Sequence, residues 1–254
     1  MSGHDGLRVV VTGGASGIGA ELVKQLTSAG ASVLAADLDT DGLATLARTT
    51  GCATATVDVA DPAGNENLID AAVDAFAGLD LVFLNAGVLD RRREDMSDPF
   101  RVADLDMDRY DVVRGVLFDA VVHGTIAATR AMAPAGGGSI VATASAAGLV
   151  PWHPTPIYSA AKHAVVGWVR AIAPALERDG VRINAICPGG VATPLIGMTA
   201  DAAETIDRLL APAQVAEAMI ATALDQGTGQ AISVVAGRHP LAQVHDFNEI
   251  PGFP

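Results

Sequence analysis

Short apolar runs alternate with helical patterns along almost the whole chain, and this order restricts the folds that the chain can adopt. After the first run, for example, Ile18, Leu22 and Leu26 recur at the spacing of one helix face. Strands that alternate with helices require right-handed crossovers, which produce a parallel sheet covered by helices on both faces. The runs are nearly continuous in apolar residues, as buried parallel strands are. Seven strands are expected, at 8–12, 31–37, 53–59, 79–87, 138–145, 181–187 and 231–237.

The segments between these runs have helical patterns or lie on the surface. Pro174 should kink the helix that contains it or end it early. Residues 88–108 are rich in Arg and Asp, which indicates a surface excursion. Helices are expected after the first glycine-rich turn, in the short sequence LATLART, and at 65–77, 109–133, 157–178, near 201–210 and at 212–224.

No linker or internal repeat divides the chain, so we expect a single domain, 1–254, with its core at about 7–237. A length of 254 residues, half of them apolar, is enough for one large α/β domain. The tail, 238–254, is less regular in pattern. It can cover a substrate pocket, pack on a neighbouring subunit or be disordered.

The charge and the cysteines argue against several classes of function. A net charge of −13 repels phosphate backbones, so we expect no nucleic-acid partner. Cys52 and Cys187 lie far apart and show no metal-ligand spacing, so no metal site is expected. The chain has no apolar leader and no apolar run of about 20 residues, the length of a membrane helix. We therefore expect a cytoplasmic protein without a membrane partner.

The sequence TGGASGIG, residues 12–19, joins the first strand to the first helix. Its glycines permit a tight turn, close approach of the backbone to a ligand and close packing of the helix. The N-terminus of the helix offers free N–H groups and the positive end of its dipole to a pyrophosphate. This context predicts a dinucleotide site. Its expected contacts in the turn are Gly13, Ser16, Gly17, Ile18 and Gly19.

Asp37 ends the second run, in the position where a carboxylate can accept hydrogen bonds from both hydroxyls of the adenosine ribose. A 2′-phosphate there would face a like charge. The repulsion is roughly 4 kcal/mol per charge pair at about 4 Å and an effective dielectric of about 20. Neither Ser16 nor Leu38 is basic, so the expected cofactor is NAD rather than NADP.

The sequence YSAAK places Tyr158 and Lys162 one helical turn apart, on the same face. A phenol is a poor base near neutral pH because its pKa is ~10, but a nearby ammonium favours the phenolate. Ser145 ends the fifth run, and the ends of parallel strands meet at the crevice where ligands bind. Each residue alone is compatible with packing or solvation, whereas the three beside a dinucleotide site predict a reaction centre.

These motifs occur in one order, and the chain resembles the classical short-chain dehydrogenase/reductase family over residues 7–237. The resemblance implies a single-domain Rossmann fold, with a seven-stranded parallel sheet in the order 3-2-1-4-5-6-7. It also implies a dimer or tetramer packed through the helices near 109–133 and 157–178. The motifs that carry the resemblance are TGGASGIG (12–19), Asp58 in VDV, NAG (85–87), Ser145, YSAAK (158–162) and PGGVATP (188–194).

The resemblance also implies a role for each motif. Ser145 would bind the substrate oxygen, Tyr158 would exchange a proton with it, and Lys162 would favour the phenolate and bind the nicotinamide ribose. Tyr158 and Lys162 would therefore contact the cofactor as well. The other residues expected to contact it are Asp37, Leu38, Asp58, Val59, Asn85, Ala86, Gly87, Pro188, Gly189, Val191 and Thr193.

One position departs from the pattern of the family. Most classical members have an Asn in the helix after the fourth strand, where it holds a water that relays protons to the lysine. Here the aligned residue is Val121, or Leu117 if the sequence YDVV is used as the anchor. Either His123 or Asp119 rebuilds the relay, or the relay is lost and catalysis is slow or absent.

Because of this departure, two functions remain open. The first is an NAD-dependent oxidoreductase that interconverts a secondary alcohol and a ketone, acting on a hydrophobic small molecule such as a steroid, a fatty-acyl or a polyketide-like compound. The second is a catalytically impaired NAD-binding protein with a regulatory or scaffold role. The apolar residues that favour a hydrophobic substrate are Leu149, Val150, Trp152, Leu195, Ile196 and Met198.

Overall fold

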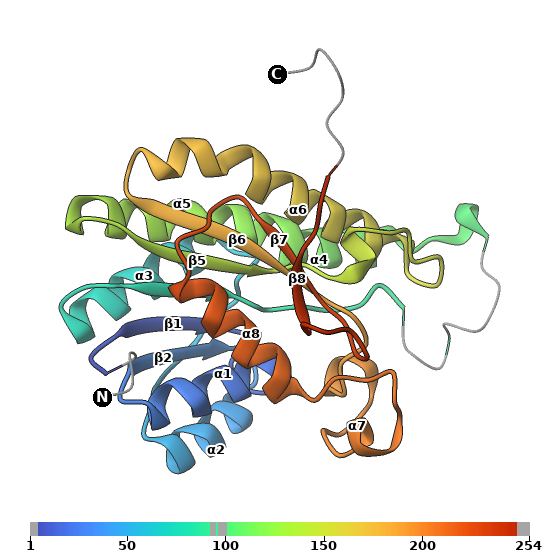
Figure 1. The fold of residues 1–254 in the computed structure, drawn as a ribbon, viewed down its shortest axis with the longest axis horizontal. Coiled ribbons are helices and arrows are strands. Elements are labelled where there is room, and N and C mark those ends of the chain that lie inside the picture. The colour runs from blue at the N-terminus through green and yellow to red at the C-terminus, as the bar shows by residue number, and fades with distance from the viewer. Residues whose placement is uncertain (1–4, 92–94, 96–100, 248–254) are drawn as a thin grey trace.

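The computed structural model describes residues 5–91, 95 and 101–247 (Figure 1). In these residues the strands form one sheet in the order β3-β2-β1-β4-β5-β6-β7-β8. The first seven strands pair in parallel, so the predicted Rossmann order is confirmed. The single domain over 1–254 reaches beyond the described residues and stays a prediction. The strands are β1 (Arg8–Thr12), β2 (Ser32–Asp37), β3 (Ala53–Thr56), β4 (Leu81–Leu84), β5 (Gly138–Thr143), β6 (Val181–Pro188), β7 (Ala231–Val234) and β8 (Ala242–Val244).

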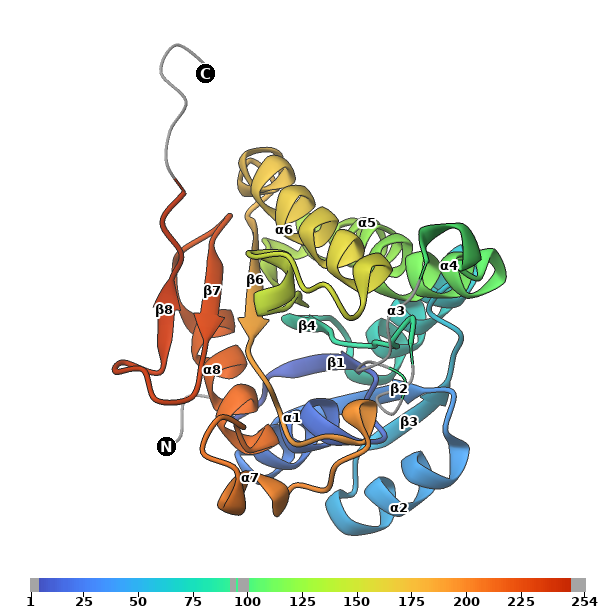
Figure 2. The ribbon, with the colours of Figure 1, turned by 90° about the vertical axis from the view of Figure 1, so that its right-hand side faces the viewer.

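The eighth strand corrects the expected strand count of seven. After β7 the tail turns back and pairs antiparallel with it, Val234 opposite Ala242 and Ile232 opposite Val244 (Figure 2). The pairing occupies an edge of the sheet that would otherwise expose the hydrogen-bonding groups of β7. A strand of three residues is too short to show an alternating pattern, so the sequence did not reveal it.

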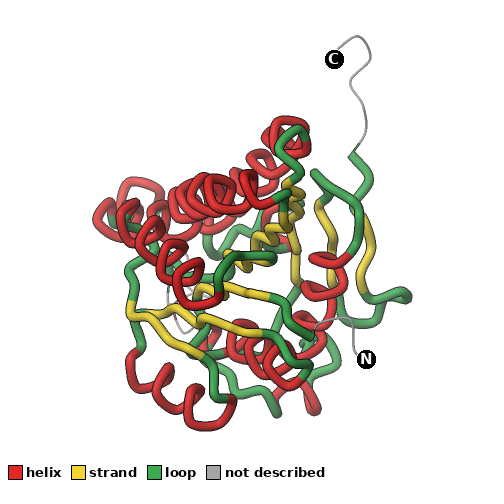
Figure 3. The backbone as a smooth tube through the Cα atoms, turned by 90° about the vertical axis from the view of Figure 1, so that its left-hand side faces the viewer, coloured by secondary structure: helices red, strands yellow, loops and turns green. Residues whose placement is uncertain are grey.

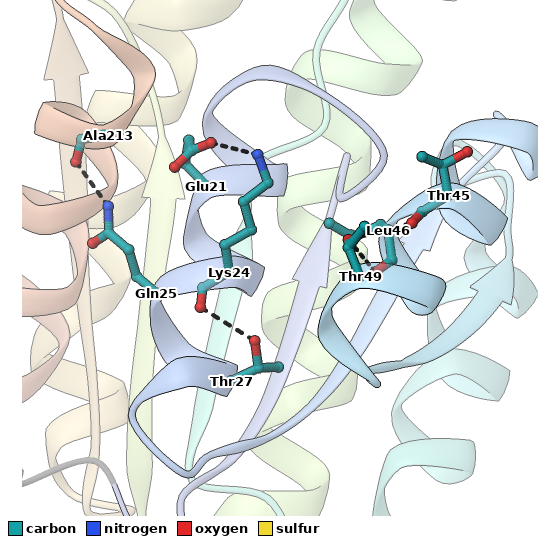
Figure 4. A network of polar contacts seen from close by, with 8 residues as sticks. All are labelled: Glu21, Lys24, Gln25, Thr27, Thr45, Leu46, Thr49 and Ala213. Atoms are coloured by element: carbon teal, nitrogen blue, oxygen red, sulfur yellow. Dashed lines mark hydrogen bonds and ion pairs between the residues drawn. The ribbon is translucent and has the colours of Figure 1, made fainter.

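Helices cover both faces of the sheet (Figure 3). Apolar side chains of α1, α2 and α8 pack on one face, and those of α3, α5 and α6 pack on the other. Helices α1 and α8 are also joined by the Gln25 side-chain amide, which donates to the Ala213 carbonyl at 3.1 Å (Figure 4). Only four residues of the helix expected near 201–210 are helical. The α-helices are α1 (Gly17–Ser28), α2 (Thr40–Thr50), α3 (Pro62–Phe76), α4 (Met107–Arg114), α5 (Ala120–Met132), α6 (Pro156–Glu177), α7 (Ala202–Thr205) and α8 (Pro212–Leu224).

Successive residues of the central strands face the two helical layers in turn. In β1, Val9 and Val11 pack with α1 and α8, whereas Val10 packs with α3, and all three are fully buried. In β4, Phe83 and Val82 divide between the layers in the same way. Both faces of these strands are therefore apolar, which explains why the runs do not alternate in hydropathy.

Pro174 does not end α6 early, so that part of the expectation was wrong. The helix continues from Pro156 to Glu177 with Pro174 in its last turn. Proline there removes one hydrogen bond, the bond that its N–H would have made to the Arg170 carbonyl. The buried side chains of Ala173 and Leu176 hold the same turn against the sheet, and this packing outweighs the local loss.

The helix expected at 109–133 forms in three consecutive parts. A π turn, Gly115–Asp119, joins α4 to α5 without a break.

The whole helical run, Met107–Ala135, has 29 residues and a mean hydropathy of 1.3 in its most apolar window, so by length and composition it could cross a membrane. This differs from the sequence expectation that no run is long enough. Half of the window is buried in the protein, as in a core helix, which accounts for its apolar residues.

Candidate functional site

The glycine-rich turn between β1 and α1 packs directly on the segment that follows β4. A Cβ atom on Gly13 would lie 2.8 Å from the Ala86 Cα, and one on Gly19 would lie 2.0 Å from the Gly13 carbonyl oxygen. Only glycine fits at either position. The Asn85 side chain fixes the two segments to each other, because its Nδ2 donates to the Thr12 carbonyl at 3.2 Å. The predicted contacts Gly13, Asn85 and Ala86 therefore lie together at the carboxyl ends of β1 and β4.

The N-terminus of α1 is free to bind an anion. Ser16 is the N-cap residue, and its side chain makes no capping hydrogen bond. The amides of Gly17, Ile18 and Gly19 lie in the first turn, where a helix provides no carbonyl partner, and the helix dipole adds positive potential. This geometry fits the pyrophosphate of a dinucleotide.

Asp37 lies beside the same turn. One of its carboxylate oxygens accepts from the Ala15 N–H at 3.0 Å and the other from the Asp39 N–H at 3.1 Å. These bonds hold the carboxylate at the end of β2, next to the N-terminus of α1. The neighbouring Leu38 is 63% exposed. The arrangement fits an acceptor for ribose hydroxyls and provides no positive charge for a ribose phosphate.

The remaining predicted cofactor residues fall into two groups. Asp58 and Val59 follow β3, where the Asp58 carboxylate accepts from the Ala60 N–H at 2.9 Å. The segment after β6 folds over the glycine turn, because a Cβ on Gly17 would lie 3.1 Å from the Thr193 Cγ2. Pro188 ends β6, and Gly189, Val191 and Thr193 follow it in this segment.

Ser145, Tyr158 and Lys162 meet at the carboxyl end of β5. Ser145 follows the strand, and its Oγ accepts from the Ala147 N–H at 3.1 Å. Tyr158 lies in the first turn of α6, and its phenol forms a side-chain hydrogen bond with Ser145. The Lys162 Nζ lies 5.7 Å from the centre of the Tyr158 ring. The three side chains can therefore share a substrate oxygen and its proton.

Burial dominates the electrostatics of this group. It raises the pKa of Tyr158 above that of a free phenol, while the hydrogen bond from Ser145 opposes the shift and the charge of Asp90 adds to it. Burial also lowers the pKa of Lys162 to about 8. The sequence led us to expect a lowered phenol pKa, whereas the protein by itself raises the pKa of Tyr158. Desolvation penalises the ammonium as well as the phenolate, so the positive charge available to Tyr158 is reduced.

Buried apolar side chains occupy both candidate positions of the missing Asn. Val121 is 4% exposed and Leu117 is fully buried, packed with Val113 and Ala161. Among the described residues the buried Nδ1 of His123 has no hydrogen-bond partner, and Asp119 pairs with Arg114. In the described part of the chain, neither candidate relay residue is hydrogen-bonded or ion-paired to Lys162.

Lys162 instead binds the main chain of β5. Its Nζ donates to the Thr143 carbonyl at 2.5 Å, and the Thr143 hydroxyl donates to the Asn85 Oδ1 at 3.1 Å. A continuous set of hydrogen bonds thus links the lysine to the glycine turn. The sequence analysis missed Thr143, which is two residues before Ser145. Its carbonyl binds Lys162 and its hydroxyl binds Asn85, and neither contact produces a pattern in the sequence.

Replacing Lys162 with methionine should stabilise the unliganded protein below pH 8. The folded pKa of about 8 lies below the unfolded pKa of about 10.5, so the unfolded state binds more protons between these values and stability rises with pH there. Below pH 8, burying the charged lysine lowers the free energy of unfolding by up to about 3 kcal/mol. The variant regains this amount minus the contribution of the hydrogen bond to the Thr143 carbonyl, which it loses. Urea unfolding at pH 7 and pH 10 measures the difference.

Lys24→Met is the matched control, because Lys24 is the other lysine of the chain and lies at the surface, paired with Glu21. It should change the free energy of unfolding by less than about 1 kcal/mol. A Lys162→Met protein that is less stable than the wild type at pH 7 would contradict a net cost of burying this ammonium.

Comparisons with known proteins agree with this geometry. The sequence profile of the short chain dehydrogenase family matches residues 8–204. The 3beta-hydroxysteroid dehydrogenase 2 of Eggerthella lenta is 36% identical over 200 residues, which cover 76% of this chain and 74% of that protein. Momilactone A synthase of Oryza sativa subsp. japonica is 37% identical over 206 residues, which cover 78% of this chain and 72% of that protein.

The fold is also similar to that of a solved structure. A crystal structure of 3-ketoacyl-(acyl-carrier-protein) reductase from Brucella melitensis, complexed with NADH, superposes with a TM-score of 0.82 at 25% identity. The superposition covers 92% of this chain and 98% of that chain. The family profile spans the glycine turn together with Ser145, Tyr158 and Lys162. The chain therefore belongs to the short chain dehydrogenase family.

Proposed function

We propose that the protein is an NAD-dependent oxidoreductase that interconverts a secondary alcohol and a ketone. The observation that carries the proposal is the meeting of Ser145, Tyr158 and Lys162 beside the dinucleotide turn. When bound, the cofactor supplies the hydride chemistry. Ser145 holds the substrate oxygen, Tyr158 accepts the alcohol proton during oxidation and returns it during reduction, and Lys162 favours the phenolate.

The preference for NAD follows from Asp37. Its carboxylate is held beside the glycine turn by the Ala15 and Asp39 amides, so it cannot readily turn away from a 2′-phosphate. Ser16 and Leu38 add no positive charge. The NADH in the similar Brucella melitensis reductase supports a nicotinamide cofactor in this fold.

A hydrophobic substrate is consistent with the side chains after β5 and β6. Val150 is 56% exposed, Trp152 is 53% exposed and Leu195 is 41% exposed. Leu149, Ile196 and Met198 belong to the same two segments. One relative is named for a hydroxysteroid, which supports a steroid-like molecule over a small polar alcohol.

A second candidate function is an NAD-binding protein with impaired catalysis. Val121 and Leu117 fill the usual Asn position with buried apolar side chains, and Lys162 binds the Thr143 carbonyl. These contacts favour slow proton exchange. The intact group of Ser145, Tyr158 and Lys162 favours the enzyme.

We further propose a cytoplasmic homodimer or homotetramer. Cys52 and Cys187 are unpaired and buried, which suits a reducing compartment. An apolar groove lies between α5 and α6, lined in part by Ile126, Trp168 and Ile172, and Ile126 is 41% exposed at its edge. A second copy of this face would cover the groove.

Tyr158→Phe should abolish NAD-linked turnover, with a loss of at least about 100-fold, because phenylalanine cannot transfer the proton. The test follows NADH absorbance with a panel of secondary alcohols that includes hydroxysteroids. Tyr110→Phe is the matched control, since Tyr110 is the other tyrosine of the chain, and it should keep activity. Equal rates for Tyr158→Phe and the wild type would refute the assignment. NAD binding by a wild-type protein that turns over none of the panel would favour the second candidate.

Asp37→Asn should shift cofactor preference toward NADP by at least about tenfold in the ratio of dissociation constants. The amide keeps an acceptor for the Ala15 N–H but removes the charge. Fluorescence titration with each cofactor measures both constants. Asp39→Asn removes a charge two residues away and should have a smaller effect. An unchanged ratio in Asp37→Asn would mean that another group selects the cofactor.

Ile126→Glu should lower the oligomer to a smaller species, because a carboxylate placed in the groove opposes burial against a second copy. Light scattering coupled to gel filtration gives the mass. Val102→Glu is the control, since Val102 is 76% exposed and belongs to neither α5 nor α6. Identical masses for Ile126→Glu and the wild type would argue against this interface.

A further inference from the structure

Asp90 lies next to the reaction centre, and neither the sequence motifs nor the proposed mechanism uses it. It follows β4 by six residues and is partly buried. One carboxylate oxygen, Oδ2, accepts from the Ile157 N–H at 3.0 Å, and the neighbouring Tyr158 amide lowers the pKa of this carboxyl. The other oxygen, Oδ1, is buried without a hydrogen-bond partner among the described residues. A charged group therefore contacts the first turn of α6, next to the residue assigned to proton transfer.

The contact fills a gap in the helix that carries Tyr158. The N-cap residue of α6, Thr155, makes no capping hydrogen bond, and its hydroxyl has no partner in the described part of the chain. Pro156 has no N–H to satisfy. The free amides of the first turn are thus those of Ile157 and Tyr158, and Asp90 accepts from the Ile157 amide at 3.0 Å. Asp90 acts as the N-cap that α6 lacks in its own sequence.

Two arginines hold the segment that carries Asp90. Arg91 donates to the Pro154 carbonyl at 3.1 Å, in the loop that precedes α6. Arg109 of α4 donates to the Leu89 carbonyl at 2.8 Å. Asp90 is therefore fixed between α4 and the start of α6, so its position relative to Tyr158 is set before a substrate enters.

We propose that Asp90 is a positioning residue that orients Tyr158 through the first turn of α6, and that its charge, held at the Ile157 N–H beside Tyr158, shifts the pH range of proton transfer. For its effect on the rate, the inference rests on the proposed function. The groups that face Tyr158 and Asp90 are Lys162 on α6, Cys187 on β6 and Arg91 in the neighbouring loop. Arg109 of α4 binds the main chain next to Asp90, at the Leu89 carbonyl.

The charge acts against ionisation of the phenol. The negative charge of Asp90 raises the pKa of Tyr158, in the same direction as burial, whereas the Ser145 hydrogen bond lowers it. The pKa of Asp90 is itself raised by burial, and the amide bonds and Arg91 oppose that shift. Removing the charge while keeping the hydrogen bonds should therefore make the phenol easier to ionise.

The decisive test is a spectroscopic titration that needs no substrate. In a Tyr110→Phe background Tyr158 is the single tyrosine, so ultraviolet difference absorbance reports its ionisation alone. Asp90→Asn keeps an acceptor for Ile157 without the charge, and its phenol should titrate at lower pH than in the background protein. Circular dichroism at each pH confirms that the fold is retained. A midpoint that is unchanged or higher would overturn the proposed effect of the charge.

The positioning role is tested by comparing two variants at Asp90. Asp90→Ala loses both the cap and the charge, so its kcat should fall at least about tenfold below that of Asp90→Asn. The pH profile of alcohol oxidation should shift toward lower pH in Asp90→Asn, in parallel with the titration. Equal kcat values for the two variants would overturn the positioning role. If no variant and no wild-type protein turns over substrate, the proposed function fails, while the titration still decides the effect of the charge.

Discussion

The structure depends on burying a parallel sheet on both faces. Val9, Val10 and Val11 of β1 are all fully buried because helical layers cover the two sides of the strand. Water therefore reaches the ligand-binding groups at the strand ends rather than at the faces. The glycine turn, Asn85 and Ser145 all follow central strands, so the same burial that stabilises the fold gathers the site at one edge.

That burial also determines the chemistry of the site. Lys162 lies one turn after Tyr158 on a helix packed against the sheet, and its side chain is almost completely enclosed. Enclosure lowers the pKa of the lysine and raises that of the phenol, so both groups favour their neutral forms. The hydrogen bonds through Thr143 and Asn85 connect this pair to the dinucleotide turn. The residues proposed for proton transfer and the glycine turn are therefore linked through the ends of β4 and β5.

Packing between distant segments determined two features that the local sequence did not predict. Pro174 disfavours a helix, but α6 passes through it because neighbouring side chains are buried on the sheet. The tail forms β8, although three residues carry no detectable strand pattern. Both results come from contacts between segments that are distant in sequence. Such contacts have no periodic signature, and this limits what one sequence can predict about the edges and ends of elements.

The resemblance to a known family implied the strand order of the sheet. The sequence by itself determined the alternation of strands and helices, the glycine turn and the grouping of Ser145, Tyr158 and Lys162. These features depend on periodicity, on residues that alone tolerate a given backbone, and on the meeting of parallel strand ends. Only the tertiary structure showed that Asp90 caps α6 and that the Thr143 carbonyl binds Lys162. A cap from another segment and a main-chain acceptor depend on distances between atoms far apart along the chain, and no residue type records those distances.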